Sequence, residues 1–279
     1  MKTQNNTNKI LFLCDLERFS SNHFKNTLNL AKTLDAEIEL FYVKKPTKIA
    51  KSDNQLSVIR TMNRDFSQTT KSIENILSSY SESVQKNINY SIAYGNVKSE
   101  VEKRIDSYQP DIIILGKRKR KQLHFLGDSL TEFVIKKHEG DIIIATPESE
   151  INPEEHLSFG IYNTDETRFE KTMLRQLFSK SKHPLKVFKS SVVSDGTEHH
   201  SLNIDSDLKK VEFVFEHSDS YLNNLSKYIS LNNINLLCLE RNAIKKNSRK
   251  KSGVVEMRNL VDNLNVSLWI SKQPNYLTS

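Results

Sequence analysis

Hydrophobic and polar positions alternate along the chain in blocks that predict strands and helices in turn. Two Ile-rich runs, 112–115 and 142–145, are apolar at consecutive positions, as is typical of strands in a parallel sheet covered on both faces. A helix-length segment at 129–138 supplies the crossover that parallel strands require. The intervening loop leaves its strand at Gly116 and enters the helix after Gly127. Because open α/β sheets bind anionic ligands at such a point, this loop is the first candidate site.

The same block pattern extends over the first half of the chain. It predicts a βαβαβαβαβ unit with strands at 9–14, 37–43, 88–93, 112–115 and 142–145, and helices at 21–34, 56–84, 97–108 and 129–138. Ser20 or Ser21 is the expected N-cap of the first helix. This half therefore predicts a five-stranded parallel sheet with flanking helices.

From residue 155 the order of elements repeats in weaker form. The pattern predicts strands at 157–162, 185–188, 211–216, 235–239 and 266–270, and helices at 167–181, 220–231 and 254–264. A polar stretch, 190–209, replaces the long second helix of the first half. We interpret the repetition as an internal duplication. It gives one domain at 1–147, a linker at 148–154 and a degenerate second domain at 155–279.

Length and composition add limits to this interpretation. At 279 residues the chain is long enough for two domains with their own cores. The chain has no apolar run of membrane-span length and its start, MKTQNNTNK, lacks a signal-peptide core, so we expect a cytoplasmic protein without a membrane partner. Cys14 and Cys238 lie inside apolar runs and are expected to be reduced core residues.

Several motifs in a fixed order resemble the universal stress protein family. They are a first strand ending in Asp15, Gly95 before a helix, PDIIILG at 110–116, Gly-Asp-Ser at 127–129 and DIIIATP at 141–147. The resemblance covers 9–147 well and 157–270 faintly, as in tandem members. It implies two tandem Rossmann-like (adenine nucleotide alpha hydrolase-like) domains, each a five-stranded parallel sheet with flanking helices, packed as a pseudo-dimer. It also implies a role in the stress response and, in some members, ATP binding.

The central loop departs from the motif of ATP-binding members of this family. That motif is G-x-x-G, nine residues, then G-Ser/Thr; Gly116 fits its first position and Gly127 its third. Lys119 stands at the second position, the loop is two residues shorter, and Asp128 occupies the hydroxyl position. A carboxylate at a helix start satisfies the amides that a phosphate would use, and Ser129 can begin a capping box. We therefore do not expect tight ATP binding.

The resemblance also assigns roles to residues at the other strand ends. It implies that Asp15 lies beside the adenosine of a bound nucleotide and that Val43 lines the adenine pocket. The alternative is that Asp15 caps a turn and Val43 belongs to the core. The full candidate ligand site consists of Asp15, Val43, Gly95, Gly116, Lys117, Lys119, Gly127, Asp128 and Ser129.

A run of five cations, 117–121, adjoins the start of the predicted helix at 129–138. It could hold a polyphosphate, a signalling nucleotide or a nucleic-acid backbone. Diffuse surface charge, part of the net charge of +7, explains it equally well, as it does the second basic loop at 245–251. No aromatic residue is interleaved to stack on bases, so we do not expect a nucleic-acid partner.

The motifs of common enzyme classes are absent from the sequence. It has no H-E-x-x-H, no P-loop and no G-x-S-x-G, and for His199 and His200 a solvated loop is favoured over a metal site. The second domain has Tyr162, Asn163, Glu240 and Arg241 at positions that correspond to the first domain's site, and is expected to be ligand-free.

These observations predict a non-catalytic, cytoplasmic stress-response protein whose first domain binds a nucleotide or another phosphate-bearing ligand weakly. The alternative is a ligand-free protein–protein interaction module whose sites have decayed. A nucleotide hydrolase is the third hypothesis, because fold does not fix function. The expected partners are the two domains themselves, paired within the chain, and a small phosphate-bearing ligand; a homodimer is left open.

Overall fold

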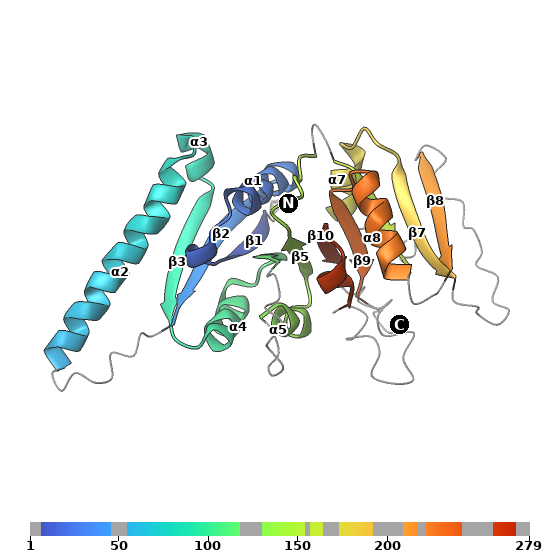
Figure 1. Cartoon of the computed structure of the whole chain (residues 1–279). Helices are drawn as coiled ribbons and strands as arrows, with labels where there is room; N and C mark the ends of the chain where they lie inside the picture. Colours follow the sequence, from blue (N-terminus) through green and yellow to red (C-terminus); the bar gives the residue numbers. More distant parts are fainter. Residues whose placement is uncertain are drawn as a thin grey trace, which may run out of the picture.

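The computed structural model describes residues 7–45, 55–117, 130–153, 157–163, 173–191, 209–216, 221–241 and 259–271. Its strands form one ten-stranded sheet in the order β3-β2-β1-β4-β5-β10-β9-β6-β7-β8 (Figure 1). The order 3-2-1-4-5 in the first half is mirrored by 8-7-6-9-10 in the second. The predicted fold class, α/β with a mostly parallel sheet and flanking helices, is confirmed.

The first half contributes five strands to this sheet. They are β1 (Asn8–Cys14), β2 (Ala36–Lys44), β3 (Ile88–Tyr94), β4 (Ile112–Gly116) and β5 (Asp141–Ala145). Its helices are η1 (Leu16–Arg18), α1 (Ser21–Leu34), α2 (Gln55–Ser78), α3 (Glu82–Gln85), α4 (Val97–Tyr108) and α5 (Leu130–Lys137). All five strands lie close to their predicted positions.

The prediction of one helix at 56–84 is wrong in one respect, because the structure has two helices there, α2 and α3. The Ser78 hydroxyl donates to the Asn75 carbonyl over 3.0 Å, and the Ser79 hydroxyl to the Ile76 carbonyl over 2.7 Å. Serine side chains that bond to nearby carbonyls offer the backbone an alternative to the helical ladder. The serine-rich sequence here therefore ends the long helix early.

The second half contributes the other five strands and fewer described helices. The strands are β6 (Phe159–Tyr162), β7 (Leu185–Ser191), β8 (Lys210–Glu216), β9 (Leu236–Glu240) and β10 (Ser267–Ser271). The helices are α7 (Met173–Ser179) and α8 (Tyr221–Leu231), and 259–263 is also helical. The start of the helix expected at 167–181 and that of the helix expected at 254–264 lie outside the described residues, as does most of the polar stretch 190–209.

The two halves join through β5 and β10, the antiparallel pair in a sheet whose other described pairings are parallel. Ile143 lies opposite Trp269. The pairings of β4 with β5 and of β9 with β10 give these two residues equivalent places in their halves. A pseudo-two-fold axis therefore passes between Ile143 and Trp269, both of which are fully buried.

Two hydrophobic layers cover the sheet, one on each face. One layer packs residues of α1, α2 and α7 against the strands, and the other packs residues of α4, α5 and α8. Both layers run through both halves, since Ile143 and Trp269 belong to the first layer and Ile144 and Leu268 to the second. The core is thus continuous across the junction.

The segment predicted to be a linker packs along α1. Three asparagines spaced along this helix donate from their side-chain amides to the backbone carbonyls that follow β5: Asn22 to Pro147 over 3.1 Å, Asn26 to Ser149 over 2.7 Å and Asn29 to Ile151 over 3.0 Å. The side chain of Ile151 is fully buried. Residues 147–151 are therefore packed against the folded body.

Two further expectations concern cysteines and charge. Cys238 is buried, Cys14 is half-buried, and both are free thiols.

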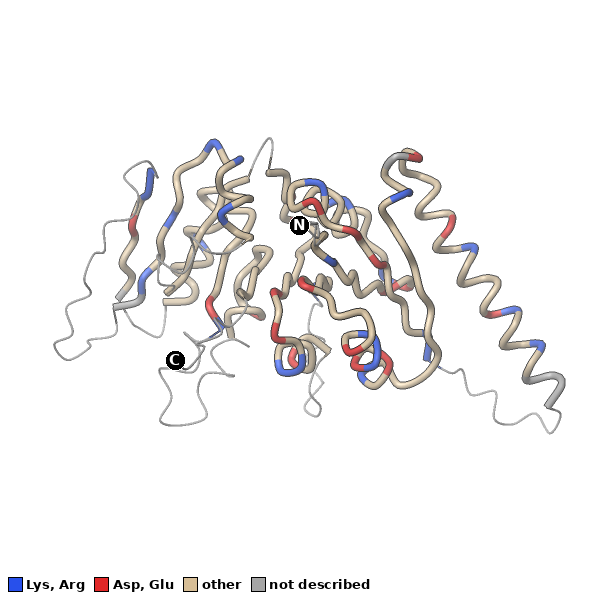
Figure 2. The backbone as a smooth tube through the Cα atoms, turned by 180° about the vertical axis from the view of Figure 1, so that it is seen from behind, with Lys and Arg blue, Asp and Glu red and all other residues tan. Residues whose placement is uncertain are grey.

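Lys, Arg, Asp and Glu are interspersed along the described helices (Figure 2). None of the helices that the structure describes is both long and apolar enough to span a bilayer.

Candidate functional site

The carboxyl ends of β1, β2, β3 and β4 meet at one edge of the sheet. β1 pairs with β2 on one side and with β4 on the other. The strand order therefore reverses between β1 and β4, which makes this point the topological switch point of the sheet. Open α/β sheets bind ligands at such a switch point. Asp15, Val43, Gly95 and Gly116 lie at or directly after these four strand ends. Lys117 follows Gly116 at the same edge, so the structure brings five of the nine predicted site residues there.

Gly95 shapes the turn from β3 into α4. Its φ of 152° lies in a region that side chains disfavour, and its amide donates to the Lys44 carbonyl over 3.1 Å. The next residue, Asn96, caps α4: its side-chain oxygen accepts from the amides of Lys98 and Ser99 over 3.1 and 3.3 Å. The first amides of α4 are therefore already satisfied by the chain itself.

Val43 is half-buried and packs in the layer that contains α4. The preceding residue, Tyr42, belongs to the opposite layer. Burial raises the pKa of the Tyr42 hydroxyl, and the nearby carboxylates of Glu17 and Asp15 raise it further. Asp15 therefore lies in an acidic corner beside an aromatic side chain, which suits hydroxyl and amino groups better than a phosphate.

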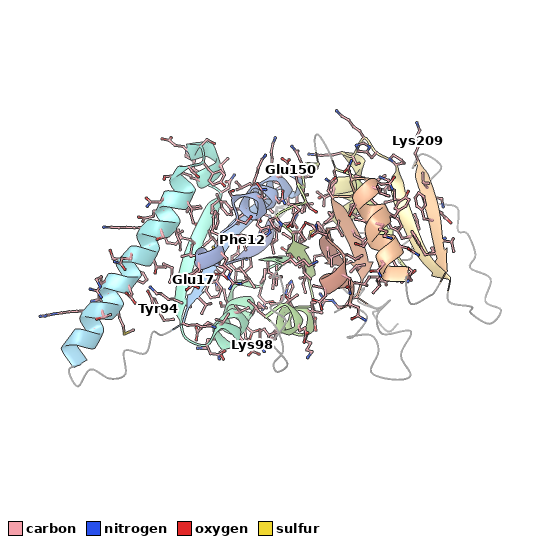
Figure 3. The ribbon with its side chains drawn as sticks, viewed as in Figure 1. Phe12, Glu17, Tyr94, Lys98, Glu150 and Lys209 are labelled. Atoms are coloured by element: carbon pink, nitrogen blue, oxygen red, sulfur yellow. The ribbon has the colours of Figure 1, made fainter. Side chains whose placement is uncertain are left out.

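Tyr94 lies in the same corner, at the end of β3. Figure 3 shows Tyr94 and Glu17 at the same edge of the sheet, and both act electrostatically on Tyr42. The ring of Tyr94 lies 6.4 Å from that of Phe66 on α2, between centroids. Its hydroxyl is buried and lacks a hydrogen-bond partner among the described residues. Sequence reasoning missed Glu17, Tyr42 and Tyr94; the signal was an aromatic residue near the end of two adjacent strands.

The cation at the end of β2 is paired within the protein. The Lys44 ammonium lies 3.6 Å from the Asp65 carboxylate and donates to the Thr69 hydroxyl over 3.4 Å; both partners are on α2. Lys44 therefore holds α2 against the sheet.

Gly116 lies under the imidazole of His23, from the first turn of α1. A Cβ atom added to Gly116 would lie 2.8 Å from the Nδ1 atom of His23 and 2.9 Å from its Cε1 atom. Such contacts are too short for any side chain, so a larger residue at this position would displace the His23 ring. Sequence reasoning placed Gly116 correctly at the strand end but gave no signal for His23, which belongs to no motif.

Lys117 reaches toward the second half of the chain. Its ammonium donates to the Leu264 carbonyl over 2.5 Å. Burial lowers the pKa of Lys117, and the carboxylates of Asp262 and Glu148 partly offset this decrease. In this structure Lys117 therefore serves the junction between the halves.

Arg241 makes the reciprocal contact from the second half. Strand register makes it the equivalent of Lys117, since each residue directly follows the end of its strand, β9 or β4. Its guanidinium donates to the carbonyls of His138 and Gly140, the latter over 2.7 Å. His138 and Leu264 are also equivalent, because each lies three residues before β5 or β10. Each half thus sends one cation to the same backbone position of the other.

The rest of the predicted site lies outside the described residues. This applies to Lys119, Gly127, Asp128 and Ser129, to the rest of the basic run 117–121, and to the loops that contain His199 and residues 245–251. Within the described ranges, the side chains form no cluster of His, Cys, Asp and Glu suited to a metal ion. The described part of the site is therefore an acidic, aromatic corner with a histidine beside Gly116.

The geometry can be set beside known proteins. The profile of the universal stress protein family matches residues 6–145. The structure of a universal stress protein from Archaeoglobus fulgidus DSM 4304 is 15% identical, covers 96% of this chain and 97% of its own, and superposes with a TM-score of 0.64. That of a putative universal stress protein from Pseudomonas aeruginosa UCBPP-PA14 is 10% identical, covers 95% and 93%, and has a TM-score of 0.56.

A third structure, of a universal stress protein in complex with cAMP, is 13% identical and covers 50% of this chain and 98% of its own, with a TM-score of 0.34. No curated protein matches the chain significantly. At these identities the two full-length matches establish the fold over nearly the whole chain.

Proposed function

The chain belongs to the universal stress protein family, and on that premise we propose that it is a non-catalytic binding protein whose first half holds a nucleotide or another phosphate-bearing ligand weakly. The observation that carries this proposal is the convergence of Asp15, Tyr42, Tyr94 and Gly116 at the switch point of the parallel sheet. Open α/β folds bind their ligands at the carboxyl edge of the sheet, beside such a switch point.

The chemistry of this edge suits the sugar and base of a nucleotide. The carboxylates of Asp15 and Glu17 can accept hydrogen bonds from ribose hydroxyls or from an exocyclic amino group. The buried hydroxyl of Tyr94 has no partner within the described part of the chain, and buried polar groups in native proteins are usually hydrogen-bonded. A ligand at this edge would supply the missing partner.

The phosphate side of the site supports weak rather than tight binding. Lys44 is paired with Asp65, Lys117 donates to Leu264, and the first amides of α4 are capped by Asn96. These cations and amides would have to exchange a partner within the protein for a phosphate. We therefore expect a dissociation constant on the order of 0.1 to 1 mM, about 4 to 5.5 kcal/mol of binding free energy.

A non-catalytic role agrees with the side chains at this edge. Cys14 is the last residue of β1. Burial raises the pKa of its thiol to about 12, and the carboxylate of Asp15 contributes to the increase. Such a thiol is protonated at neutral pH and is a poor nucleophile.

The test is calorimetric titration of the full chain with adenosine, AMP, cAMP and ATP. We expect saturable binding that Asp15→Ala weakens at least tenfold, because the variant loses an acceptor for the sugar or base. Glu82→Ala is the matched control, since Glu82 is an exposed carboxylate at the start of α3. Equal binding by both variants would overturn the site. Phosphate release during prolonged incubation with ATP would favour the hydrolase hypothesis instead.

One observation favours a second candidate, a protein-interaction module. On α2 the side chains of Ile59, Met62 and Phe66 lie near one another along the helix and are 53%, 45% and 49% exposed. Exposed apolar clusters commonly mark interaction surfaces. Sedimentation of the chain at increasing concentration, compared with Met62→Lys, tests whether this cluster forms a homodimer. A monomer in both samples excludes the homodimer.

A further inference from the structure

His23 is a histidine at the ligand edge that no motif of the sequence marks. It lies in the first turn of α1, where its amide donates to the Ser20 hydroxyl over 3.4 Å. Its ring lies directly over Gly116, the last residue of β4, in space that any larger residue at 116 would need. The ring therefore stands where the loop of the proposed site begins.

The second observation is that one nitrogen of this ring has no partner. The Nε2 atom of His23 is buried and makes no hydrogen bond to any described residue. Leaving a buried polar group unsatisfied costs about 1 to 3 kcal/mol. The Tyr94 hydroxyl, at the same edge, is also buried and unpaired. A polar ligand that reached the ring would supply the partner that the Nε2 atom lacks.

The charges around the ring determine how it responds to pH. Burial lowers the pKa of His23 below its ordinary value of 6.5, and the carboxylate of Glu148, in the segment after β5, raises it in part. Glu148 acts in the same direction on Lys117, which follows β4. At neutral pH the imidazole is therefore mainly uncharged, with the Glu148 carboxylate near it.

We propose that His23 is a proton-dependent ligand of the phosphate group in this site, so that binding of the phosphate strengthens as the pH falls. This inference rests on the proposed function, since it assigns a phosphate contact within the same site. A neutral imidazole offers one N–H donor, whereas an imidazolium offers two and a positive charge. Charge-assisted hydrogen bonds are roughly twice as strong as neutral ones. A bound phosphate accordingly favours the protonated ring and takes up a proton on binding.

The experiment is calorimetric titration of the full chain with cAMP between pH ~5.5 and ~8.0, across the range in which histidine titrates. cAMP is chosen because its phosphodiester keeps one negative charge over this range, whereas the monoester of AMP titrates near pH ~6. Adenosine, which has no phosphate, is titrated in parallel. We expect cAMP to bind about three- to tenfold tighter at the acidic end, with net proton uptake, and adenosine to show no such trend.

Two variants separate a phosphate contact from a packing role. His23→Gln keeps a hydrogen-bonding side chain over Gly116 but cannot titrate, so its affinity for cAMP should not change with pH. His183→Gln removes an exposed histidine of the second half and should behave like the wild type. If His23→Gln keeps the pH dependence, or if cAMP binds the wild type equally at all pH values, the role of His23 is overturned while the site stands. If none of adenosine, AMP, cAMP and ATP binds, the proposed function fails as well.

Discussion

The outer strands of the two halves have the same backbone arrangement but opposite surface chemistry. In the first half, the face of β2 and β3 that packs with α2 carries apolar and aromatic residues: Ile38, Leu40, Tyr42, Ile88, Tyr90, Ile92 and Tyr94. The equivalent positions of β7 and β8, by strand register, are Leu185, Val187, Lys189, Lys210, Glu212, Val214 and Glu216. Four of the seven positions are charged.

Three charged residues of this second-half face pair with one another, one pair across β7 and β8 and one within β8. The Lys189 ammonium lies 3.1 Å from the Glu212 carboxylate, and that of Lys210 lies 3.5 Å from it. Val214 is 66% exposed on the same strand. Between β2 and β3 the chain forms α2, whereas residues 192–208, between β7 and β8, lie outside the described part of the chain. The comparison teaches that the strands and their register persist while the residues on one face of the sheet change from apolar to charged.

The largest expected effect concerns Arg241, which is buried where its equivalent in the first half, Lys117, is half-buried. Arg241 is 7% exposed and donates to at least two carbonyls of the first half. Arg241→Met leaves these buried carbonyls unsatisfied, so we expect the free energy of unfolding to fall by about 2 to 4 kcal/mol. Urea denaturation measures this change. The exposed Arg60→Met should change stability by less than about 0.5 kcal/mol; a similar value for Arg241→Met would contradict the contact.

The second prediction sharpens the contrast between the outer strands. Ile92 and Val214 occupy equivalent positions in β3 and β8, but Ile92 packs in the layer that contains α2. Ile92→Lys places a charge in a partly buried apolar site, so we expect a loss of about 1 to 3 kcal/mol. Val214→Lys adds a charge to an exposed, already charged face and should change stability by less than about 0.5 kcal/mol. Thermal unfolding of both variants tests the difference, which disappears if α2 does not cover β3.

The smallest effect is expected at Lys117, the half-buried equivalent of Arg241. Lys117→Met removes one donor from the Leu264 carbonyl, so the free energy of unfolding should fall by about 1 kcal/mol at neutral pH. Its dependence on pH is a second signature. Because burial lowers the pKa of Lys117 from 10.5, the unfolded chain binds more protons between the lowered value and 10.5.

Stability of the wild type should therefore rise with pH across that window, relative to Lys117→Met. Unfolding experiments at several alkaline pH values give the slope. Lys71→Met, at an exposed position of α2, is the control and should retain the slope of the wild type. Parallel slopes for wild type and Lys117→Met would show that the Lys117 ammonium is not buried at the junction.

Much of the fold could be predicted from the sequence because the strand cores are continuous apolar runs. β4 and β5, with their Ile-rich runs, agree with prediction to within a residue. β7 extends to Ser191, whereas its predicted end was Phe188. The prediction stopped early because the last residues of the strand are polar. A search for continuous apolar runs does not detect the polar end of such a strand. Local sequence therefore located the strand cores better than the strand ends.

The site was less predictable, because its contacts join residues distant in sequence. Asp15, Val43, Gly95 and Gly116 were found through the order of motifs at strand ends. The contact of His23 with Gly116 and that of Lys117 with Leu264 depend on how α1 and the second half pack against β4. Tertiary packing decides such pairs, so neither residue spacing nor charge could have indicated them.

The antiparallel pairing of β5 with β10 has a consequence for how the molecule responds to dilution. Two separate chains that met at such an edge would dissociate at low concentration, whereas a tether keeps the local concentration of the two edges in the millimolar range. Residues 147–151, held along α1, form part of that tether. The association of the halves is thereby independent of how much protein a cell makes. An unpaired strand of isoleucines, a template for aggregation, is never offered to other chains.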